Sequence, residues 1–113
     1  MSQNKELVAA SATPIILSIL TRGESYGYAI IQEIKDLSDS KIEWVDGMLY
    51  PVLRRLEKQG HILSEWRVGD TGKRRRYYRI AKSGREQLVE HKRQWQMTNM
   101  VMTKLWEGTQ CSS

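Results

Sequence analysis

The feature that most constrains this chain is its last long segment, for which the pattern of apolar residues predicts one helix over residues 82–106. At about 100° per residue, the large apolar side chains of this helix fall on two nearly opposite sides. One side carries Leu88, Trp95, Met102 and Trp106, and the other carries Met97, Val101 and Leu105. Since one small domain covers only one side of a helix about 37 Å long, the second side predicts a homodimer.

The preceding residues predict three shorter helices in a single domain. The chain has 113 residues, and its hydrophobic content of 40%, with four Trp and five Tyr, excludes a fully disordered chain. The first helix is clearest from Pro14 to Arg22, with Thr13 as N-cap, while residues 5–12 form either a separate turn or the start of a helix kinked at Pro14. The second helix runs from after Ser25 to Leu37.

The third helix begins at an N-cap, Asp46, and ends at a left-handed Gly60. A hairpin follows, with a strand over 62–68, turn residues over 69–72 and a return strand over 76–80. This order predicts a mainly α fold with a small β-hairpin, that is, a winged helix-turn-helix followed by a long C-terminal dimerisation helix.

We divide the chain accordingly into three segments. We expect residues 1–80 to form a winged helix-turn-helix domain that includes the N-terminal helix, an architecture typical of DNA binding. We expect residues 81–107 to form the dimerisation helix of the same compact unit, and residues 108–113 to form a flexible tail.

Positive charge is concentrated in the second half of the chain. Residues 1–56 carry six basic and seven acidic groups, whereas residues 57–113 carry twelve basic and six acidic groups. Six of these cations lie between Arg67 and Arg79 with one acid, Asp70, so they should repel one another unless an anion is bound. The expected partner is double-stranded DNA, with an anionic membrane surface second, and a merely solvated charged face is the alternative.

The predicted DNA-binding residues come from three places in the chain. The start of the third helix would enter the major groove, and the basic hairpin would contact phosphates. The second helix begins next to Tyr28, for which a place in the core is the alternative; Tyr50 could likewise be packed with its hydroxyl satisfied locally. The complete set is Tyr28, Gly47, Met48, Tyr50, Arg54, Lys73, Arg74, Arg75 and Arg76.

The sequence gives little support to an enzyme. His61 and His91 have no Asp, Glu or Cys cluster at metal-ligand spacing, and Cys111 has no basic neighbours that would lower its thiol pKa. No glycine-rich phosphate loop follows a strand, so no catalytic residue, metal or cofactor is expected. One cysteine, no apolar run near the ~20 residues of a membrane span and no secretion signal predict a cytoplasmic protein without a membrane partner.

The middle of the last helix could also bind a small molecule. Aromatic and thioether side chains there can line a pocket for planar, apolar or cationic compounds. The candidate residues are Leu88, Trp95, Val101 and Met102, and ordinary dimer-interface core is the alternative for the same stripe.

Residues 14–106 resemble the PadR family of bacterial transcriptional regulators, in its branch with a single C-terminal helix. The resemblance rests on residues 26–30, 47–62 and 72–80, which include Leu49-Tyr50-Pro51, Arg55-Leu56-Glu57 and a tyrosine pair after the basic run. The sequence departs from the family pattern at Ala81 and Met48, where threonine is common, and at Lys73, where glycine or arginine is common.

The resemblance implies a homodimer that binds a palindromic operator and usually represses transcription. It further implies release from DNA by a phenolic or drug-like compound in some members, and Trp95 matches a tryptophan that lines a dimer-interface pore in one multidrug-responsive group. Two alternatives remain open: a small-molecule sensor with the interface pocket as its main site, and a protein-interaction module that binds anionic partners without a defined DNA site.

Overall fold

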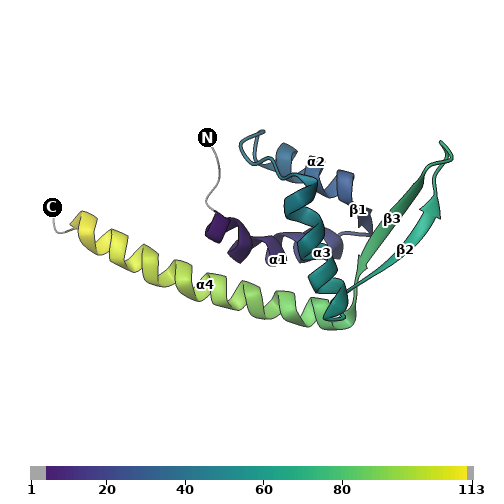
Figure 1. Cartoon of the computed structure of the whole chain (residues 1–113). Coiled ribbons are helices and arrows are strands. Elements are labelled where there is room, and N and C mark those ends of the chain that lie inside the picture. Colours follow the sequence, from purple (N-terminus) through teal and green to yellow (C-terminus); the bar gives the residue numbers. More distant parts are fainter. Residues whose placement is uncertain (1–4, 112–113) are drawn as a thin grey trace.

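The computed structural model describes the backbone of residues 5–111 and the side chains of residues 10–108. The fold has four helices and three strands among these residues and confirms the winged helix-turn-helix with a long C-terminal helix (Figure 1). The elements are α1 (Lys5–Thr21), β1 (Ser25–Tyr26), α2 (Gly27–Leu37), α3 (Asp46–Lys58), β2 (Ile62–Val68), β3 (Arg74–Ile80) and α4 (Lys82–Cys111).

Helix α1 is longer than the clearest part of the predicted helix and contains Pro14 in its interior. The prediction of Thr13 as an N-cap is therefore wrong, because this residue lies well inside the helix. A proline in a helix interior costs about 3 kcal/mol, but full burial of an aliphatic side chain contributes about 1.5–3 kcal/mol. Ile16, Leu17 and Leu20 are all at most 2% exposed, so burial on this helix outweighs the proline.

A short strand, β1, was not predicted, and it changes the hairpin into a three-stranded sheet of order β1-β3-β2. Ser25 pairs with Tyr78 and Tyr26 pairs with Tyr77, so β3 lies in the middle of the sheet. β3 also begins at Arg74 instead of residue 76, because β2 continues to Val68 and the antiparallel register places Arg74 opposite it.

The hydrophobic core lies between α1, α2, α3 and the base of the hairpin. Its fully buried large side chains come from all four of these parts and are Ile16, Leu17, Leu20, Ile30, Leu49, Leu53, Leu56 and Ile62. The second turn of α4 joins this core through Leu88, which is 3% exposed. The core therefore fixes α3 and the hairpin as one unit and includes only the beginning of α4.

The two ends of α3 are held by local backbone hydrogen bonds. The N-cap is Val45 in extended conformation, one residue before the predicted Asp46, whose carboxylate instead occupies the first turn, where the helix dipole favours negative charge. At the other end Gly60 has φ +82°, as predicted. Its N–H donates to the Glu57 carbonyl (3.0 Å), and the His61 N–H donates to the Leu56 carbonyl (2.9 Å).

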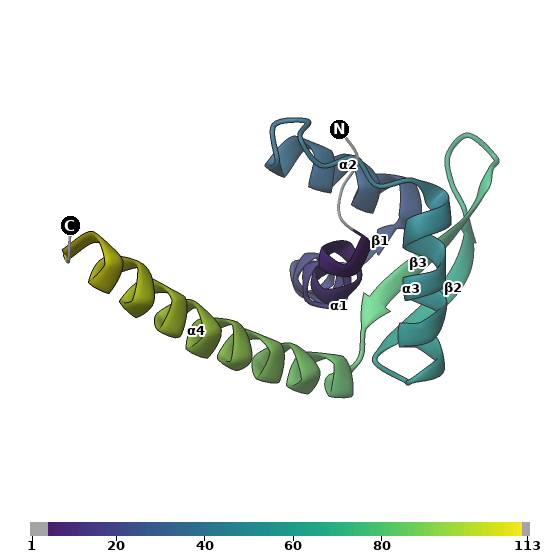
Figure 2. The ribbon, with the colours of Figure 1, turned by 60° about the vertical axis from the view of Figure 1, so that its left-hand side comes forward.

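Helix α4 leaves the compact part of the molecule after packing against α1. Figure 2 shows its far end well separated from the other elements, and the molecule measures 62 × 33 × 21 Å. The helix ends at Cys111, so it includes residues 108–111 of the predicted tail, while residues 112 and 113 lie outside the described residues. Beyond Leu88, apolar side chains such as Trp95 (53%) and Leu105 (63%) are exposed.

Candidate nucleic-acid interface

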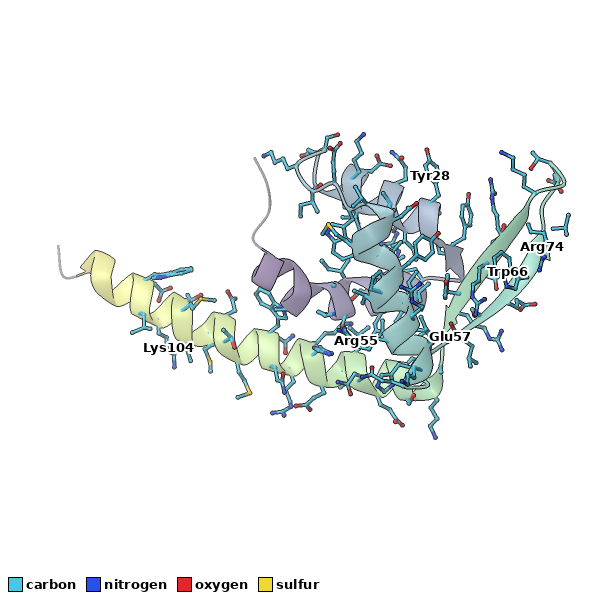
Figure 3. All side chains as sticks on the ribbon, viewed as in Figure 1. Tyr28, Arg55, Glu57, Trp66, Arg74 and Lys104 are labelled. Carbon is cyan, nitrogen blue, oxygen red and sulfur yellow. The ribbon has the colours of Figure 1, made fainter. Side chains whose placement is uncertain are left out.

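An open groove of about 590 Å³ lies between α3, the start of α2 and the hairpin. Figure 3 shows Trp66 and Arg74 along the hairpin, with Tyr28 at the start of α2. The groove is lined by one glycine and by aromatic and charged residues: Tyr26, Gly27, Tyr28, Tyr50, Arg54, Glu57, Trp66, Arg74, Arg75, Arg76 and Tyr78. Six of the nine predicted DNA-binding residues thus meet at one place, whereas Gly47, Met48 and Lys73 do not line the groove.

Tyr50 takes its position from a glycine on the neighbouring helix. The Tyr50 ring is half-buried and packs against the core, and its hydroxyl lies directly over Gly27. A Cβ at Gly27 would overlap this hydroxyl and would lie 2.8 Å from the ring carbon Cζ. The glycine between the two tyrosines of residues 26–28 therefore makes room for the side chain from α3. Sequence reasoning missed this contact because the two residues are far apart in the chain.

The first turn of α3 presents backbone more than side chains. Gly47 is exposed, and a Cβ there would meet no atom within 4 Å, so this part of the helix is open to a large partner. Met48 is half-buried and packs against the core. The helix N-terminus carries a partial positive charge, which favours a phosphate.

Three hairpin cations have no carboxylate partner among the described residues. Lys73 lies at the hairpin turn and is exposed. The Arg74 guanidinium lies 4.9 Å from the centre of the Trp66 ring, and that of Arg75 lies 4.5 Å from the centre of the Tyr26 ring. Stacking on a ring orients a guanidinium and leaves its N–H groups free to donate.

The other three cations of the basic segment are paired with glutamates that lie outside residues 67–79. Arg67 binds Glu24 (2.8 Å from Nη2 to Oε2) and Glu65 (3.0 Å), and Arg79 also binds Glu65 (3.5 Å). Arg76 binds Glu57 (3.2 Å). The expectation that six cations face a single acid is therefore wrong, because packing of the loop before β1 and of α3 against the hairpin supplies additional carboxylates.

These pairs shift the ionisation of their members. A hydrogen bond from Arg67 is the main reason that the pKa values of the Glu24 and Glu65 carboxyls lie below the ordinary value, and the same bonds raise the pKa of Arg67. Burial raises the pKa of Tyr78. The unbalanced positive charge that the hairpin brings to the groove is therefore that of Arg74 and Arg75, whereas Arg67 and Arg79 are paired with carboxylates.

A second groove, of about 480 Å³, lies between α1 and α4. Its walls are mostly apolar and include Ile15, Ile19, Leu88 and Trp95, while Lys92 contributes a cation. Two of the four predicted pocket residues, Leu88 and Trp95, are therefore here. The other two, Val101 and Met102, lie farther along α4 and do not line this groove.

The structure offers no metal-binding cluster and no membrane span within the part of the chain that it describes. No three His, Cys, Asp or Glu side chains come together there, and no helix there is long and apolar enough to cross a bilayer. His61 binds the Ser83 hydroxyl (3.1 Å), and His91 lies 3.5 Å from the Gln87 amide. The side chain of Cys111 lies outside the described residues.

Comparison with known proteins places this architecture among regulators of transcription. A transcriptional regulator of Clostridium thermocellum has a similar structure, with a TM-score of 0.80 and 35% identity over 88% of this chain and 97% of its own. A PadR family regulator of Eggerthella lenta has a TM-score of 0.74 and 39% identity over 90% and 87%. Transcriptional regulator Rv3488 of Mycobacterium tuberculosis is 38% identical over 89 residues, 79% of each chain.

The family model described as "Transcriptional regulator PadR-like family" matches residues 16–90, which include the core, α3, the hairpin and the start of α4. The chain therefore belongs to the PadR-like family of transcriptional regulators.

Proposed function

We propose that this chain is a homodimeric repressor that binds a palindromic DNA operator through α3 and the hairpin. The observation that carries the proposal is the groove beside α3, where Arg74 and Arg75 are held on aromatic rings without a carboxylate partner among the described residues. A cytoplasmic location follows from the proposal, because the DNA partner is there.

We call α3 the recognition helix and the hairpin β2–β3 the wing. The groove suits a phosphodiester strand that passes between them. The first turn of α3, with the open Gly47, would enter the major groove, and Lys73 at the wing turn would reach flanking DNA. Tyr28 is 68% exposed, so its phenol is free to donate to a phosphate oxygen. Arg54, one turn after Tyr50, adds a cation to the same wall.

The long helix supports the dimer. Met97, Met100, Val101, Leu105 and Trp106 are each more than half exposed on α4. A second copy of this chain would cover them and would present two recognition helices to DNA, which requires half-sites about 34 Å apart or a multiple of that spacing. Two copies would also double the net charge of +5.

The groove between α1 and α4 favours a second, regulatory function. Trp95 and the aliphatic side chains around it provide a flat apolar surface beside the α4 segment expected at the dimer interface. We propose that a small planar aromatic compound binds here and weakens DNA binding. Titration of such compounds should change Trp fluorescence in the wild type and not in Trp95→Ala; the absence of a saturable change in both would exclude this function.

DNA selection from a random pool tests the main proposal. We expect recovery of a palindrome with one dominant half-site spacing, and the recovery of no enriched sequence would exclude it. The salt dependence of affinity then tests the wing. Replacing Arg74 and Arg75 together by Ala should reduce the magnitude of the slope of log K against log salt by about 0.9 for each lost phosphate contact.

Arg79→Ala is the matched control for the wing, because this arginine lies on the same strand but is paired with Glu65. Its slope should stay close to that of the wild type. Equal slopes for the wild type, the control and the Arg74/Arg75 variant would contradict the assignment of phosphate contacts to the wing.

A further inference from the structure

We infer that Glu57 is a positioning residue, which holds the wing at a fixed angle to the recognition helix and thereby sets the discrimination between operator and non-specific DNA. It acts through a cluster that we call the wing bridge, namely Glu57, Ser64 and Arg76. The inference rests on the proposed DNA-binding function and concerns a residue outside the predicted set of DNA contacts.

The wing bridge joins three elements at the base of the groove. The Ser64 hydroxyl on β2 donates to Glu57 Oε2 on α3 (2.5 Å). Arg76 on β3 donates from Nη2 to both Glu57 oxygens (3.2 and 3.3 Å) and from Nε to the Ser64 hydroxyl (2.9 Å). The Glu57 and Arg76 side chains are 30% and 38% exposed, so the pair is partly shielded from solvent and from salt.

The bridge continues outward to the unpaired cations. Arg76 and Arg74 both lie over the ring of Trp66, with guanidinium carbons 5.5 and 4.9 Å from its centre. Figure 3 shows the order along the wing, from Glu57 on α3 past Trp66 to Arg74. The Glu57 carboxylate on α3 is thus connected to Arg74, which we expect to contact phosphate, through its ion pair with Arg76 and through the one Trp66 ring on which both arginines stack.

Glu57 also restrains a cation that could otherwise bind DNA. Non-specific affinity depends on the number of phosphates that are neutralised, so a free Arg76 would increase it. Operator binding additionally requires that α3 and the wing reach their own parts of the duplex at the same time. The Glu57 carboxylate therefore lowers the affinity for DNA of any sequence. It also preserves the relative position of α3 and the wing, which only operator binding requires.

Glu65 provides the matched control. It also accepts hydrogen bonds from two arginines, Arg67 and Arg79, and it lies on the same sheet. None of its hydrogen bonds or ion pairs described above reaches α3. Replacing either glutamate by glutamine removes one negative charge, so a uniform effect of charge is common to both variants and cancels in the ratio of operator to non-specific affinity.

The test measures, for the full-length dimer, the affinity for the selected operator and for a random duplex over a series of salt concentrations. For Glu57→Gln we expect tighter binding of the random duplex, a salt slope about 0.9 greater in magnitude, and a roughly tenfold lower ratio of operator to random affinity. Glu65→Gln should keep the wild-type ratio. An unchanged ratio in a folded Glu57→Gln protein would overturn the inference.

Two further variants protect the test from a folding defect. Ser64→Ala removes only the bridging hydroxyl and should lower the ratio by roughly threefold. The double exchange of Glu57→Arg with Arg76→Glu should have a higher ratio of operator to random affinity than the two single variants predict when their effects are added. Simple additivity of the two effects would contradict a direct bridge.

Hydrogen exchange of the β3 amides, measured without DNA, distinguishes failure of the inference from failure of the proposed function. Exchange should be faster in Glu57→Gln than in Glu65→Gln. Faster exchange together with a wild type that selects no operator would retain the bridge and reject the DNA-binding function; equal exchange in the two variants would reject the bridge.

Discussion

Replacing Gly84 by Ala should destabilise the protein, although alanine is a better helix former than glycine. Gly84 is the third residue of α4 and is buried against the turn that links α3 to β2. A Cβ there would overlap the carbonyl oxygen of His61 and would lie 2.8 Å from Ile80 Cγ1. Because the obstructing atom belongs to the backbone, no side-chain rotation relieves the overlap.

The size of the effect follows from three contributions. Overpacking of this kind costs about 1–3 kcal/mol. Moving the His61 carbonyl also weakens its hydrogen bond from the Ala81 N–H (2.9 Å), which is worth about 1 kcal/mol. The helix propensity of alanine returns at most about 1 kcal/mol. We therefore expect a net loss of about 1–3 kcal/mol in the free energy of unfolding.

Gly27→Ala is the internal comparison, because it places the same methyl group at the start of another helix. Here the obstruction is the tip of the Tyr50 side chain, which can rotate away, so the loss of stability should stay below about 1 kcal/mol. The displaced phenol lies in the DNA groove, and operator affinity should fall instead. Gly84→Ala should thus mainly reduce stability, whereas Gly27→Ala should mainly reduce DNA affinity.

Urea unfolding followed by circular dichroism measures both variants, at matched protein concentration because the proposed dimerisation would contribute to stability. The reasoning would be refuted by a Gly84→Ala protein as stable as the wild type. A larger loss of stability for Gly27→Ala than for Gly84→Ala would also refute the reasoning, because the more rigid obstructing atom, the His61 carbonyl oxygen, should cause the larger loss.

Two other predictions concern acid stability and assembly. Because Arg67 lowers the pKa of Glu24 and Glu65 in the folded state, the unfolded chain takes up protons first, and stability should decrease as the pH falls below about 4.5. Arg67→Ala should flatten this decrease in acid titrations followed by circular dichroism, and an unchanged profile would contradict it. Val101→Glu should dissociate the proposed dimer in analytical ultracentrifugation while the monomer stays folded, because Val101 is 54% exposed within one chain. Lys104→Glu, an exposed polar position on the same helix, is the control; dissociation by both variants to the same extent would mean that charge, and not the loss of apolar contact, is responsible.

The helices and the hairpin were predictable from the sequence because their signals are local. Apolar residues at helical spacing define α2 and α3, and Gly60 ends α3 in the conformation that glycine favours. Strand β1 has two residues, too few for an alternating pattern, and it exists only because β3 offers a free edge. The prediction of Thr13 as an N-cap was wrong for a similar reason. The burial of Ile16, Leu17 and Leu20, which outweighs the cost of Pro14 inside α1, depends on the tertiary structure.

The candidate site was predictable in its composition but not in its charge balance. The sequence shows a basic run beside two tyrosines, and the structure does bring the predicted Tyr28, Tyr50 and Arg74 to one groove. Pairing of Arg67 with Glu24 joins β2 to the loop before β1, and no spacing rule connects the two residues. No spacing rule connects Gly27 with Tyr50 either, and the only feature of the sequence that relates to this contact is the missing side chain at Gly27.

The pairing of β1 with β3 has a consequence for the order in which the protein forms during synthesis. Tyr26 leaves the peptidyl transferase about 50 residues before its partner Tyr77, which corresponds to roughly 3–10 s at ordinary rates of translation. Helices α1, α2 and α3 contain only local hydrogen bonds and can form during that interval, whereas the sheet cannot close until β3 emerges. The groove is therefore the last part of the winged domain to be completed, and α4, which follows it in the chain, becomes available for pairing only when the DNA-binding surface is already being assembled.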